Sequence, residues 1–286
     1  MKRRFAMHST TTGALPLLDS IAVARAAEFD AFEVGDDKFA RHIAAGGTLA
    51  DVRDGLAGAG VEAVAFTAND PLPLPRGTDD VALFERSHRA LCERVAALGC
   101  SLLVVHPPLL LDHATPNIWR DTATRTLASV SRAASACGIR VALEFVGTGD
   151  SAVRTLADAR EIAAAASPPV GLVLDAFHFY AGASTWDMID GLDPSAVALV
   201  RLTDSESLPL ERLTDANRAL PGDGVVPMRE LLRQVESVGY RGTYSIHLAR
   251  TDYWDWEPRR LARVAHESIE SVCAEKDEME GLLEYD

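Results

Sequence analysis

The sequence predicts one α/β domain in the form of a closed barrel of eight parallel strands, the (β/α)8 or TIM barrel. The first observation is that short apolar runs alternate with Ala- and Leu-rich stretches eight times along the 286 residues. Such alternation with right-handed crossovers builds either an open doubly wound sheet or a closed barrel. The second observation is that eight units in a chain of this length match the size of the closed barrel. The third is that no Gly-x-Gly-x-x-Gly motif follows the first run, which removes the main support for a dinucleotide-binding sheet.

The strands are predicted from the short apolar runs, which suit strands buried on both faces of a parallel sheet. The eight ranges are Arg4–Ser9, Ala31–Val34, Val61–Phe66, Ser101–His106, Ile139–Phe145, Gly171–Leu174, Val197–Leu202 and Thr243–Leu248. A proline-rich loop, Asp70–Pro75, follows the third of them, and a long loop that runs to Gly224 follows the seventh.

The helices are predicted from the Ala- and Leu-rich stretches between these runs. Their ranges are Leu17–Phe29, Thr48–Gly58, Asp79–Leu98, Asn117–Cys137, Thr155–Ala166, Pro227–Val238 and Pro258–Glu275. Thr48 is expected to cap its helix, and Pro227 to stand at the first helical position. Because there is no linker or shift in composition, residues 1–286 are predicted as one domain, with an acidic, loose tail from about residue 275.

Polar residues stand at nearly all the carboxyl ends of the predicted strands, and in a barrel these ends meet at one mouth. In chain order they are His8, Glu33, Asn69, His106, Glu144, Asp175 with His178, Arg201 with Asp204, and His247. Glu144 and His247 are embedded in apolar runs, where a polar side chain has few purely structural uses. Glu33 and His106 are candidate substrate contacts, with packing roles as the alternative. His8 and Asn69 are interpreted as loop residues.

Asp175 and His178 form the most informative pair. Asp175 directly follows the apolar run Gly171–Leu174, and a buried carboxylate must be paired, hydrogen-bonded or bound to a cation. A single turn would place His178 beside it. The pair indicates either a catalytic or binding element at the mouth or a carboxylate that caps the next helix beside a packed histidine, and the sequence leaves both open.

At these residues the chain resembles the xylose isomerase-like sugar phosphate isomerase/epimerase family. The resemblance is carried by Glu144, the Asp175-x-x-His178 element, Arg201-x-x-Asp204, the loop Arg218-Ala-Leu-Pro-Gly-Asp-Gly224 and the segment Gly239-Tyr-Arg-Gly-Thr-Tyr-Ser-Ile246. It covers nearly the whole chain. Inosose dehydratases, ketose 3-epimerases, hydroxypyruvate isomerases and dehydroshikimate dehydratases share the barrel of this family.

The resemblance implies a divalent metal at the mouth, held by residues of strands five to eight. Glu144 and Asp175 match the family's first two ligands. Arg201 and His247 stand where the family has a His or Gln and a Glu, so the expected ligand set is the non-standard Glu144, Asp175 and His247. The resemblance also implies that His178 and Arg218 bind substrate oxygens, although Arg218 could instead pair with an aspartate of its own loop.

Proton removal beside a carbonyl needs a base and an electrophile that stabilises the oxyanion. Glu144 or His247 is predicted as the base, with Arg201 as a further catalytic residue. A divalent metal would be the electrophile. Carboxylate ligands favour Mn, Mg or Co, and a histidine ligand moves the preference toward Zn, Fe or Mn. The alternative is a site without metal, because Glu144, Asp175 and Arg201 already sum to a charge of -1 and a guanidinium can stabilise an oxyanion itself.

Three functions therefore stay open. The first is an isomerase or epimerase of a small hydroxy-carbonyl compound, sugar- or cyclitol-like. The second is a lyase that dehydrates a cyclic keto-polyol. The third is a divergent member of the family that works without metal and binds a ligand or carries out other chemistry.

Composition and charge limit the kinds of partner and the cell compartment that we expect for this protein. A net charge of -14 argues against a protein that grips a phosphate backbone. The apolar runs are too short to span a bilayer, and the start of the chain lacks the pattern of a signal peptide. Four scattered cysteines without a Cys-x-x-Cys motif suggest reduced residues of a cytoplasmic protein. Trp254 and Trp256 are predicted to shape the pocket or, alternatively, to pack internally or at the interface of a homodimer.

Overall fold

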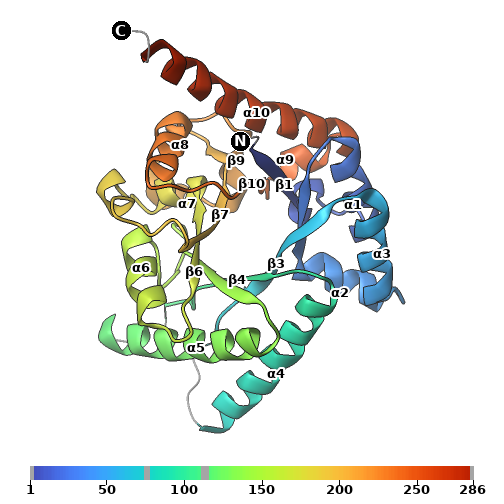
Figure 1. The fold of residues 1–286 in the computed structure, drawn as a ribbon, viewed down its shortest axis with the longest axis vertical. Coiled ribbons are helices and arrows are strands. Elements are labelled where there is room, and N and C mark those ends of the chain that lie inside the picture. The colour runs from blue at the N-terminus through green and yellow to red at the C-terminus, as the bar shows by residue number, and fades with distance from the viewer. Residues whose placement is uncertain (1–2, 74–77, 111–115, 284–286) are drawn as a thin grey trace.

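Eight parallel strands close into a barrel, as the sequence predicts. The computed structural model describes residues 3–73, 78–110 and 116–283. Around the barrel the strands lie in the order β1-β10-β7-β6-β5-β4-β3-β2, and helices surround them (Figure 1). The strands are β1 (Arg4–His8), β2 (Ala31–Gly35), β3 (Glu62–Pro71), β4 (Leu102–His106), β5 (Arg140–Glu144), β6 (Gly171–Asp175), β7 (Val197–Arg201) and β10 (Thr243–Ile246).

The outer layer consists mainly of the helices that connect successive strands. They are α1 (Leu17–Ala26), α2 (Asp36–Ala44), α3 (Leu49–Ala59), α4 (Thr78–Ala97), α5 (Pro116–Ala136), α6 (Leu156–Ala165), α7 (Ala176–Ala181), α8 (Met228–Ser237), α9 (Thr251–Trp254) and α10 (Pro258–Leu283). In the described ranges no helix is both long and apolar enough to cross a membrane. The short strands β8 (Asp204–Ser205) and β9 (Arg218–Ala219) pair in antiparallel fashion outside the barrel.

The structure differs from the sequence prediction mainly in short elements. Helices α2, α7 and α9 and the β8–β9 pair were not predicted, because elements of two to nine residues carry too weak a periodic pattern. The helix predicted over Leu17–Phe29 ends at Ala26, before Glu28, which has a positive φ of 66°. Pro227 is the N-cap residue of α8, and the first helical position is Met228. The predicted loose tail from residue 275 is part of α10 up to Leu283, and residues 284–286 lie outside the described ranges.

Helix α3 shows how local sequence sets an element. Thr48 Oγ1 accepts a hydrogen bond from the Asp51 amide at 3.2 Å, and the Asp51 carboxylate accepts one from the Thr48 amide at 2.7 Å. This reciprocal capping box satisfies two amides that the first turn leaves free, as expected for Thr48. Gly60 ends the helix in the left-handed region, at φ 65°, which a glycine adopts without strain.

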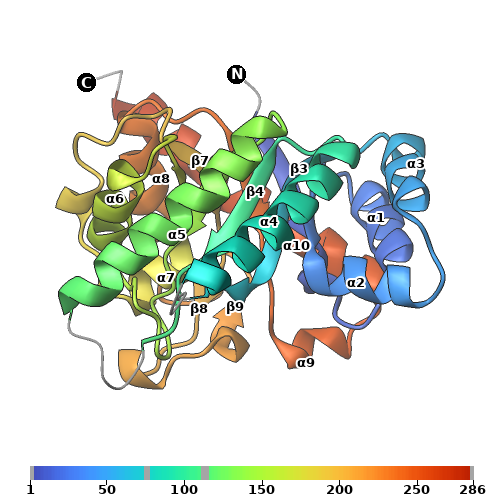
Figure 2. The ribbon, with the colours of Figure 1, turned by 90° about the horizontal axis from the view of Figure 1, so that it is seen from below.

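Two apolar layers hold the barrel and leave its mouth polar. The larger core packs the outward faces of the strands against the helices. A second, small cluster of Ala65, Leu102, Val104, Ala142, Val173 and Leu199 fills the barrel interior. In Figure 2, β8, β9 and α9 lie at one end of the barrel, opposite the start of β1 and the end of α10. Because the strands are parallel, their carboxyl ends form the mouth of the barrel at the end where β8, β9 and α9 lie.

Candidate active site

A cavity of about 440 Å³ lies at the carboxyl ends of the barrel strands. Side chains that could act chemically come to its wall from four different places in the barrel. His106 ends β4, Glu144 ends β5, His178 lies on α7, and His247 follows β10. The expectation that residues far apart in the sequence converge on one mouth is met by these four.

Arg201 occupies the centre of the barrel mouth below this cavity. Its guanidinium is fully buried and binds two carboxylates. Nη2 lies 2.6 Å from Glu33 Oε2, and Nη1 lies 2.5 Å from Glu144 Oε2. Thr67 Oγ1 accepts a further hydrogen bond at 3.0 Å, and Ser245 Oγ donates to Glu33. Burial would lower the pKa of Arg201, but Glu144 and Glu33 raise it overall, so the cation is permanent.

Glu144 has two oxygens in very different surroundings. Oε2 accepts from Arg201 and lies 2.9 Å from His106 Nε2, whose ring is also held by the Ala68 carbonyl at 2.9 Å from Nδ1. Oε1 is buried and has no hydrogen-bond partner among the described residues. Burial would raise the pKa of Glu144, but Arg201 and His106 outweigh it and hold the pKa well below its ordinary value. The residue is thus a carboxylate with one free oxygen.

Arg218 forms a second buried ion cluster with Asp175. Its Nη1 lies 2.9 Å from Asp175 Oδ2 and its Nε lies 2.7 Å from Asp215 Oδ1. The guanidinium also stacks over the Phe177 ring, with 4.5 Å between Cζ and the ring centroid. Nη2 donates to His178 Nε2 at 3.0 Å, which leaves the proton of a neutral His178 on Nδ1. That Nδ1 is buried and has no partner among the described residues, so it is a free donor.

Asp175 caps the next helix, as one of the two interpretations left open by the sequence predicts. Its Oδ1 accepts from the His178 amide at 3.1 Å, which makes it the N-cap of α7. The same carboxylate is the partner of Arg218. The cap fixes where His178 stands, and the ion pair fixes where the arginine stands.

The loop that carries Arg218 is folded by Asp204. This carboxylate accepts from the amides of Val226 at 2.8 Å and Gly222 at 3.0 Å. A side chain on Gly224 would lie 2.4 Å from Asp204 Oδ1 and 2.3 Å from a backbone oxygen, so only glycine fits there. The Arg-x-x-Asp and Pro-Gly-x-Gly motifs thus serve to bend the loop so that Arg218 reaches back to Asp175.

His8 was interpreted as a loop residue but packs directly against the candidate site. Its ring lies 4.2 Å from the His247 ring, centroid to centroid, with an interplanar angle of 41°. It is 1% exposed, and burial followed by Arg201 lowers its pKa well below the ordinary value. Only its place at the end of the first strand could have indicated this.

The described side chains offer one group of possible metal ligands here. Ligand atoms of Glu144, Asp175 and His178 lie within 4.8 Å of one another. Two carboxylates and an imidazole suit Zn, Mn or Fe. Glu144 Oε1 has free lone pairs, whereas Arg218 uses Asp175 and His178 Nε2. The donor types therefore fit a divalent cation, but the cation competes with a guanidinium. His178, instead of the expected His247, is the third member of this group.

The predicted site residues fall into two groups, those that line the cavity and those that are buried behind its wall. His106, Glu144, His178 and His247 line the cavity. The other four, Glu33, Asp175, Arg201 and Arg218, are not among the described lining residues; they are 0% exposed and pair with one another behind the wall. The lining also includes Thr10 and Asp215, which the sequence gave no reason to select. Trp254 and Trp256 do not line the cavity; Trp254 packs over Gly13, and Trp256 contacts Tyr253.

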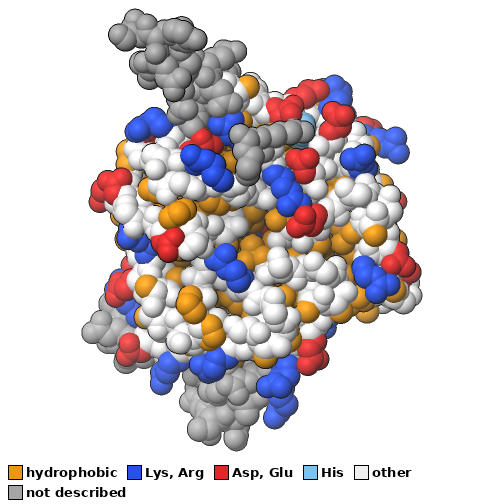
Figure 3. All heavy atoms as spheres, viewed as in Figure 1, with side chains coloured by type: hydrophobic (Ala, Val, Ile, Leu, Met, Phe, Trp, Pro, Cys, Tyr) orange, Lys and Arg blue, Asp and Glu red, His pale blue; other side chains and the backbone are white. Residues whose placement is uncertain are grey.

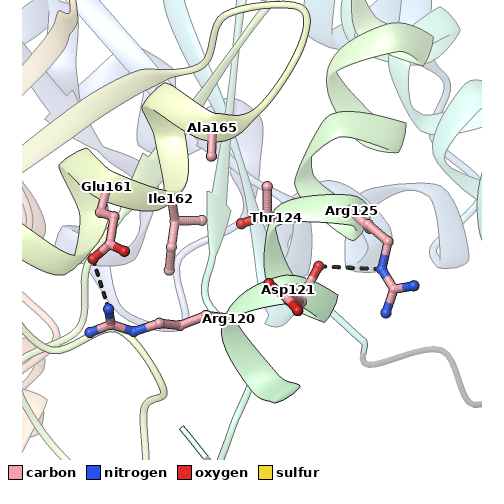
Figure 4. A pocket seen from close by; sticks show the side chains of 7 residues that line it. All are labelled: Arg120, Asp121, Thr124, Arg125, Glu161, Ile162 and Ala165. Atoms are coloured by element: carbon pink, nitrogen blue, oxygen red, sulfur yellow. Dashed lines mark hydrogen bonds and ion pairs between the residues drawn. The ribbon is translucent and has the colours of Figure 1, made fainter. Parts of the chain in front are cut away.

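A second cavity, of about 460 Å³, is an outer groove between α5 and α6. Figure 4 shows the ion pair between Arg120 and Glu161, 2.7 Å between Nη1 and Oε2, at one side of it. Its charged groups bind one another, so it offers no set of reactive side chains comparable with the barrel mouth.

Residues 21–271 match the family model of the xylose isomerase-like TIM barrel. Among curated proteins, the chain is similar to the inosose isomerase of Halalkalibacterium halodurans, with 28% identity over 187 residues. That alignment covers 65% of this chain and 66% of the relative, so the chain matches slightly less than two thirds of its length. The inosose isomerase of Bacillus subtilis is 27% identical over 65% of this chain and 67% of the relative.

Solved structures share the fold over nearly the whole chain. The IolI protein with a bound zinc atom has a TM-score of 0.89 at 22% identity, over 96% of this chain and 99% of that one. The D-psicose 3-epimerase of Clostridium cellulolyticum H10 has a TM-score of 0.74 at 15% identity, over 95% and 98%.

Proposed function

Because the chain belongs to the xylose isomerase-like TIM barrel family, we propose that it is an isomerase or epimerase which moves a proton beside the carbonyl of a sugar- or cyclitol-like substrate. The observation that carries the proposal is Glu144, a carboxylate in the cavity wall whose Oε1 is buried and unpaired. The inosose isomerases among its relatives support this reaction class.

Glu144 is the base of the proposed reaction. Its Oε2 is held by Arg201 and His106, so the carboxylate cannot rotate freely and Oε1 is the oxygen left for the substrate. Its lowered pKa keeps it ionised at neutral pH. A fixed, ionised carboxylate with a free oxygen is ready to accept a proton from carbon.

The cavity wall favours an uncharged substrate. None of its described lining residues is lysine or arginine, whereas Asp37, Asp150 and Asp215 are among them. Arg218, which the resemblance suggested for substrate oxygens, is fully buried and already donates to Asp175, Asp215 and His178. A phosphate or carboxylate would find acidic neighbours, whereas hydroxyl groups find donors such as His178 Nδ1–H. We therefore propose a neutral keto-polyol as the substrate.

The reaction then proceeds in two proton transfers on carbon. Glu144 Oε1 takes the proton from the hydroxyl-bearing carbon next to the carbonyl. The C–H electron pair forms a carbon–carbon double bond, and the carbonyl electrons pass to the oxygen, giving an enediolate. The hydroxyl proton passes to that oxygen, and Glu144 returns its proton to the former carbonyl carbon. The carbonyl has moved by one position, and every proton is accounted for.

A divalent metal on Glu144, Asp175 and His178 would polarise a substrate oxygen. We propose that this chain binds the ion more weakly than a four-ligand site does, because Arg201 and Arg218 lie against the same carboxylates. The test is metal analysis of the purified protein before and after dialysis against a chelator, beside the double variant Arg201→His with His247→Glu. The double variant should bind zinc at least about tenfold more tightly. One equivalent of metal retained by the native protein through the chelator would contradict weak binding.

The reaction is tested with inosose, the ketone of a hexahydroxycyclohexane, in deuterium oxide. We expect deuterium to enter beside the carbonyl, and Glu144→Gln to slow this exchange by about 1000-fold. Glu93→Gln, a matched change at an exposed position on α4, should exchange at the native rate. Loss of water from the ring, seen as an absorbing enone, would instead indicate the lyase. A native protein that exchanges no deuterium would exclude this substrate class.

We also propose a cytoplasmic protein whose partner is a small molecule. All four cysteines are free, as expected in a reducing compartment. The face drawn in Figure 3 carries basic and acidic side chains interspersed, without the continuous basic surface that a nucleic acid needs. A homodimer stays a prediction, to be tested by sedimentation.

A further inference from the structure

His247 and His8 form a stacked imidazole pair at one side of the cavity. Strands β1 and β10 are neighbours in the barrel, and the two rings stand at the ends of these strands, 4.2 Å apart. His247 lines the cavity, whereas His8 is buried. The backbone of His247 is anchored by Thr203, whose hydroxyl lies 3.2 Å from the His247 carbonyl oxygen. The ring that faces the cavity is thus held from behind and from one side.

The hydrogen bonds of both rings define which nitrogen carries the proton. The Thr10 amide donates to His8 Nδ1 at 3.1 Å, so the proton of His8 is on Nε2. Arg201 Nη1 lies 3.5 Å from His247 Nδ1. A guanidinium has only donors, so this ring nitrogen must present its lone pair. The proton of a neutral His247 is therefore also on Nε2.

The surroundings of His247 keep the ring neutral. The neighbours that lower its pKa are His8 from β1, Arg218 from β9, Arg201 from β7 and His106 from β4. Glu144 from β5 is the anion on this side, and it binds the same Nη1 of Arg201 that faces His247. Burial is the largest cause and these four neighbours add to it, so the pKa of His247 lies well below the ordinary value. A third positive charge beside two guanidiniums would be strongly unfavourable.

We propose that His247 is a neutral electrophile, whose Nε2–H donates to the carbonyl oxygen of the substrate while Glu144 Oε1 removes the proton from carbon. His8 is a positioning residue that fixes the plane of the His247 ring. The proposal rests on the proposed isomerase or epimerase reaction and assigns its two roles to separate residues. A neutral imidazole opposite a carboxylate base is a competent arrangement for enolisation.

This assignment leaves Glu144, and not His247, as the base. His247 Nδ1 is used by Arg201, and Nε2 carries a proton, so the ring has no free lone pair to accept one from carbon. It also explains why a histidine stands at the end of β10. A hydrogen-bond donor there stabilises the developing oxyanion and needs no metal ligand at that position.

The tautomer is tested without any substrate, by nitrogen-15 NMR of the histidine rings. We expect His247 to show a protonated Nε2 and an unprotonated Nδ1 from pH 5.5 to 8, with the signals assigned by their loss in His247→Gln. A ring protonated on Nδ1, or a cationic ring at pH 6, would overturn the proposal. Arg201→Lys keeps a cation but shortens its reach and should weaken the preference for this tautomer.

The role in catalysis is tested by deuterium exchange into inosose. His247→Gln keeps an N–H donor and should retain the rate within about tenfold, whereas His247→Leu should lose about 100-fold or more in kcat. The acidic limb of the pH profile should stay in place in both, because it belongs to Glu144. A His247→Gln variant as slow as His247→Leu, with a displaced acidic limb, would show that His247 is the base.

His8 is tested by two substitutions at one position. His8→Phe keeps a flat ring against His247 and should retain most of kcat, whereas His8→Ala should lower kcat and leave KM nearly unchanged. Equal effects of the two on kcat would refute the positioning role. A native protein that exchanges no deuterium would contradict the proposed function, and the NMR signals of His247 would still decide this proposal.

Discussion

Arg201 and Lys38 are both buried at the carboxyl end of the barrel, but their surroundings are of opposite kinds. Arg201 is 0% exposed and binds Glu33 and Glu144, which raise its pKa. Lys38, on α2, is 2% exposed and donates to two hydroxyls, Thr12 Oγ1 at 2.7 Å and Ser20 Oγ at 2.8 Å. Burial lowers the pKa of Lys38 to about 7, although Asp37 opposes this.

The difference shows that burial alone does not decide whether a charge stabilises this barrel. At Arg201 one cation binds two buried carboxylates, so removing it leaves both without their ion pair. At Lys38 only neutral hydroxyls replace water, so at neutral pH the amine is near the point of losing its proton. The first cation holds the candidate site together, and the second opposes folding whenever it is charged.

The largest effect is expected from Arg201→Met. The change leaves Glu33 and Glu144 buried close together without a cation, which should lower the free energy of unfolding by about 4 kcal/mol. Chemical denaturation followed by circular dichroism measures this. Arg201→Lys restores a cation and should recover part of the loss. A methionine variant as stable as the native protein would show that the ion pairs of Arg201 do not stabilise the fold, and the contrast with Lys38 would fail.

Lys38→Met should stabilise the protein, by roughly 3 kcal/mol at pH 6. Between pH 7 and 10.5 the unfolded chain binds more protons at this lysine than the folded chain does, so its penalty is full below pH 7 and fades as the pH rises. The gain from methionine should therefore shrink steadily toward pH 10. Denaturation at several pH values measures it, with Arg53→Met, at an exposed position on α3, as a control whose effect stays nearly constant. A gain that does not change with pH would show that Lys38 has the same pKa in the folded and the unfolded chain, and so keeps its charge on folding.

Arg218→Met should cost less than Arg201→Met, about 2 kcal/mol. Asp215, one of its two partners, is 49% exposed at the side chain and can return to water, and Asp175 keeps the His178 amide. The same denaturation series measures the difference. If the Arg218 variant proved the less stable of the two, exposure of the partner would not explain how these clusters contribute.

The smallest effect is expected from Glu33→Gln, about 1 kcal/mol. Arg201 keeps Glu144, and the amide keeps the shape of the carboxylate, but one charge and one well-placed acceptor are lost. Glu236→Gln, a carboxylate that pairs with Arg3 outside the mouth, serves as a comparison with a more exposed pair. A loss at Glu33 as large as that of Arg201→Met would mean that Glu33 is the main partner of the arginine.

The sequence predicted the barrel and four of the polar side chains in the cavity wall, because both depend on local patterns. Alternating runs identified the eight strands, and their polar ends identified His106, Glu144, His178 and His247. The partners of Arg201 and Arg218 depend on which strands become neighbours across the barrel, which no local pattern gives. Lys38 went unnoticed for a similar reason, since nothing in Asp36-Asp37-Lys38 indicates that the third side chain turns inward.

The bond between Arg201 and Glu33 has a consequence for how such a barrel can evolve. A histidine in place of Arg201 would offer a metal ligand, but it would also leave Glu33 buried without its cation. The route toward a metal-rich mouth therefore passes through a destabilised intermediate unless Glu33 changes first or at the same time. Glu33, which lies outside the cavity wall, thus makes replacement of Arg201 alone costly in stability.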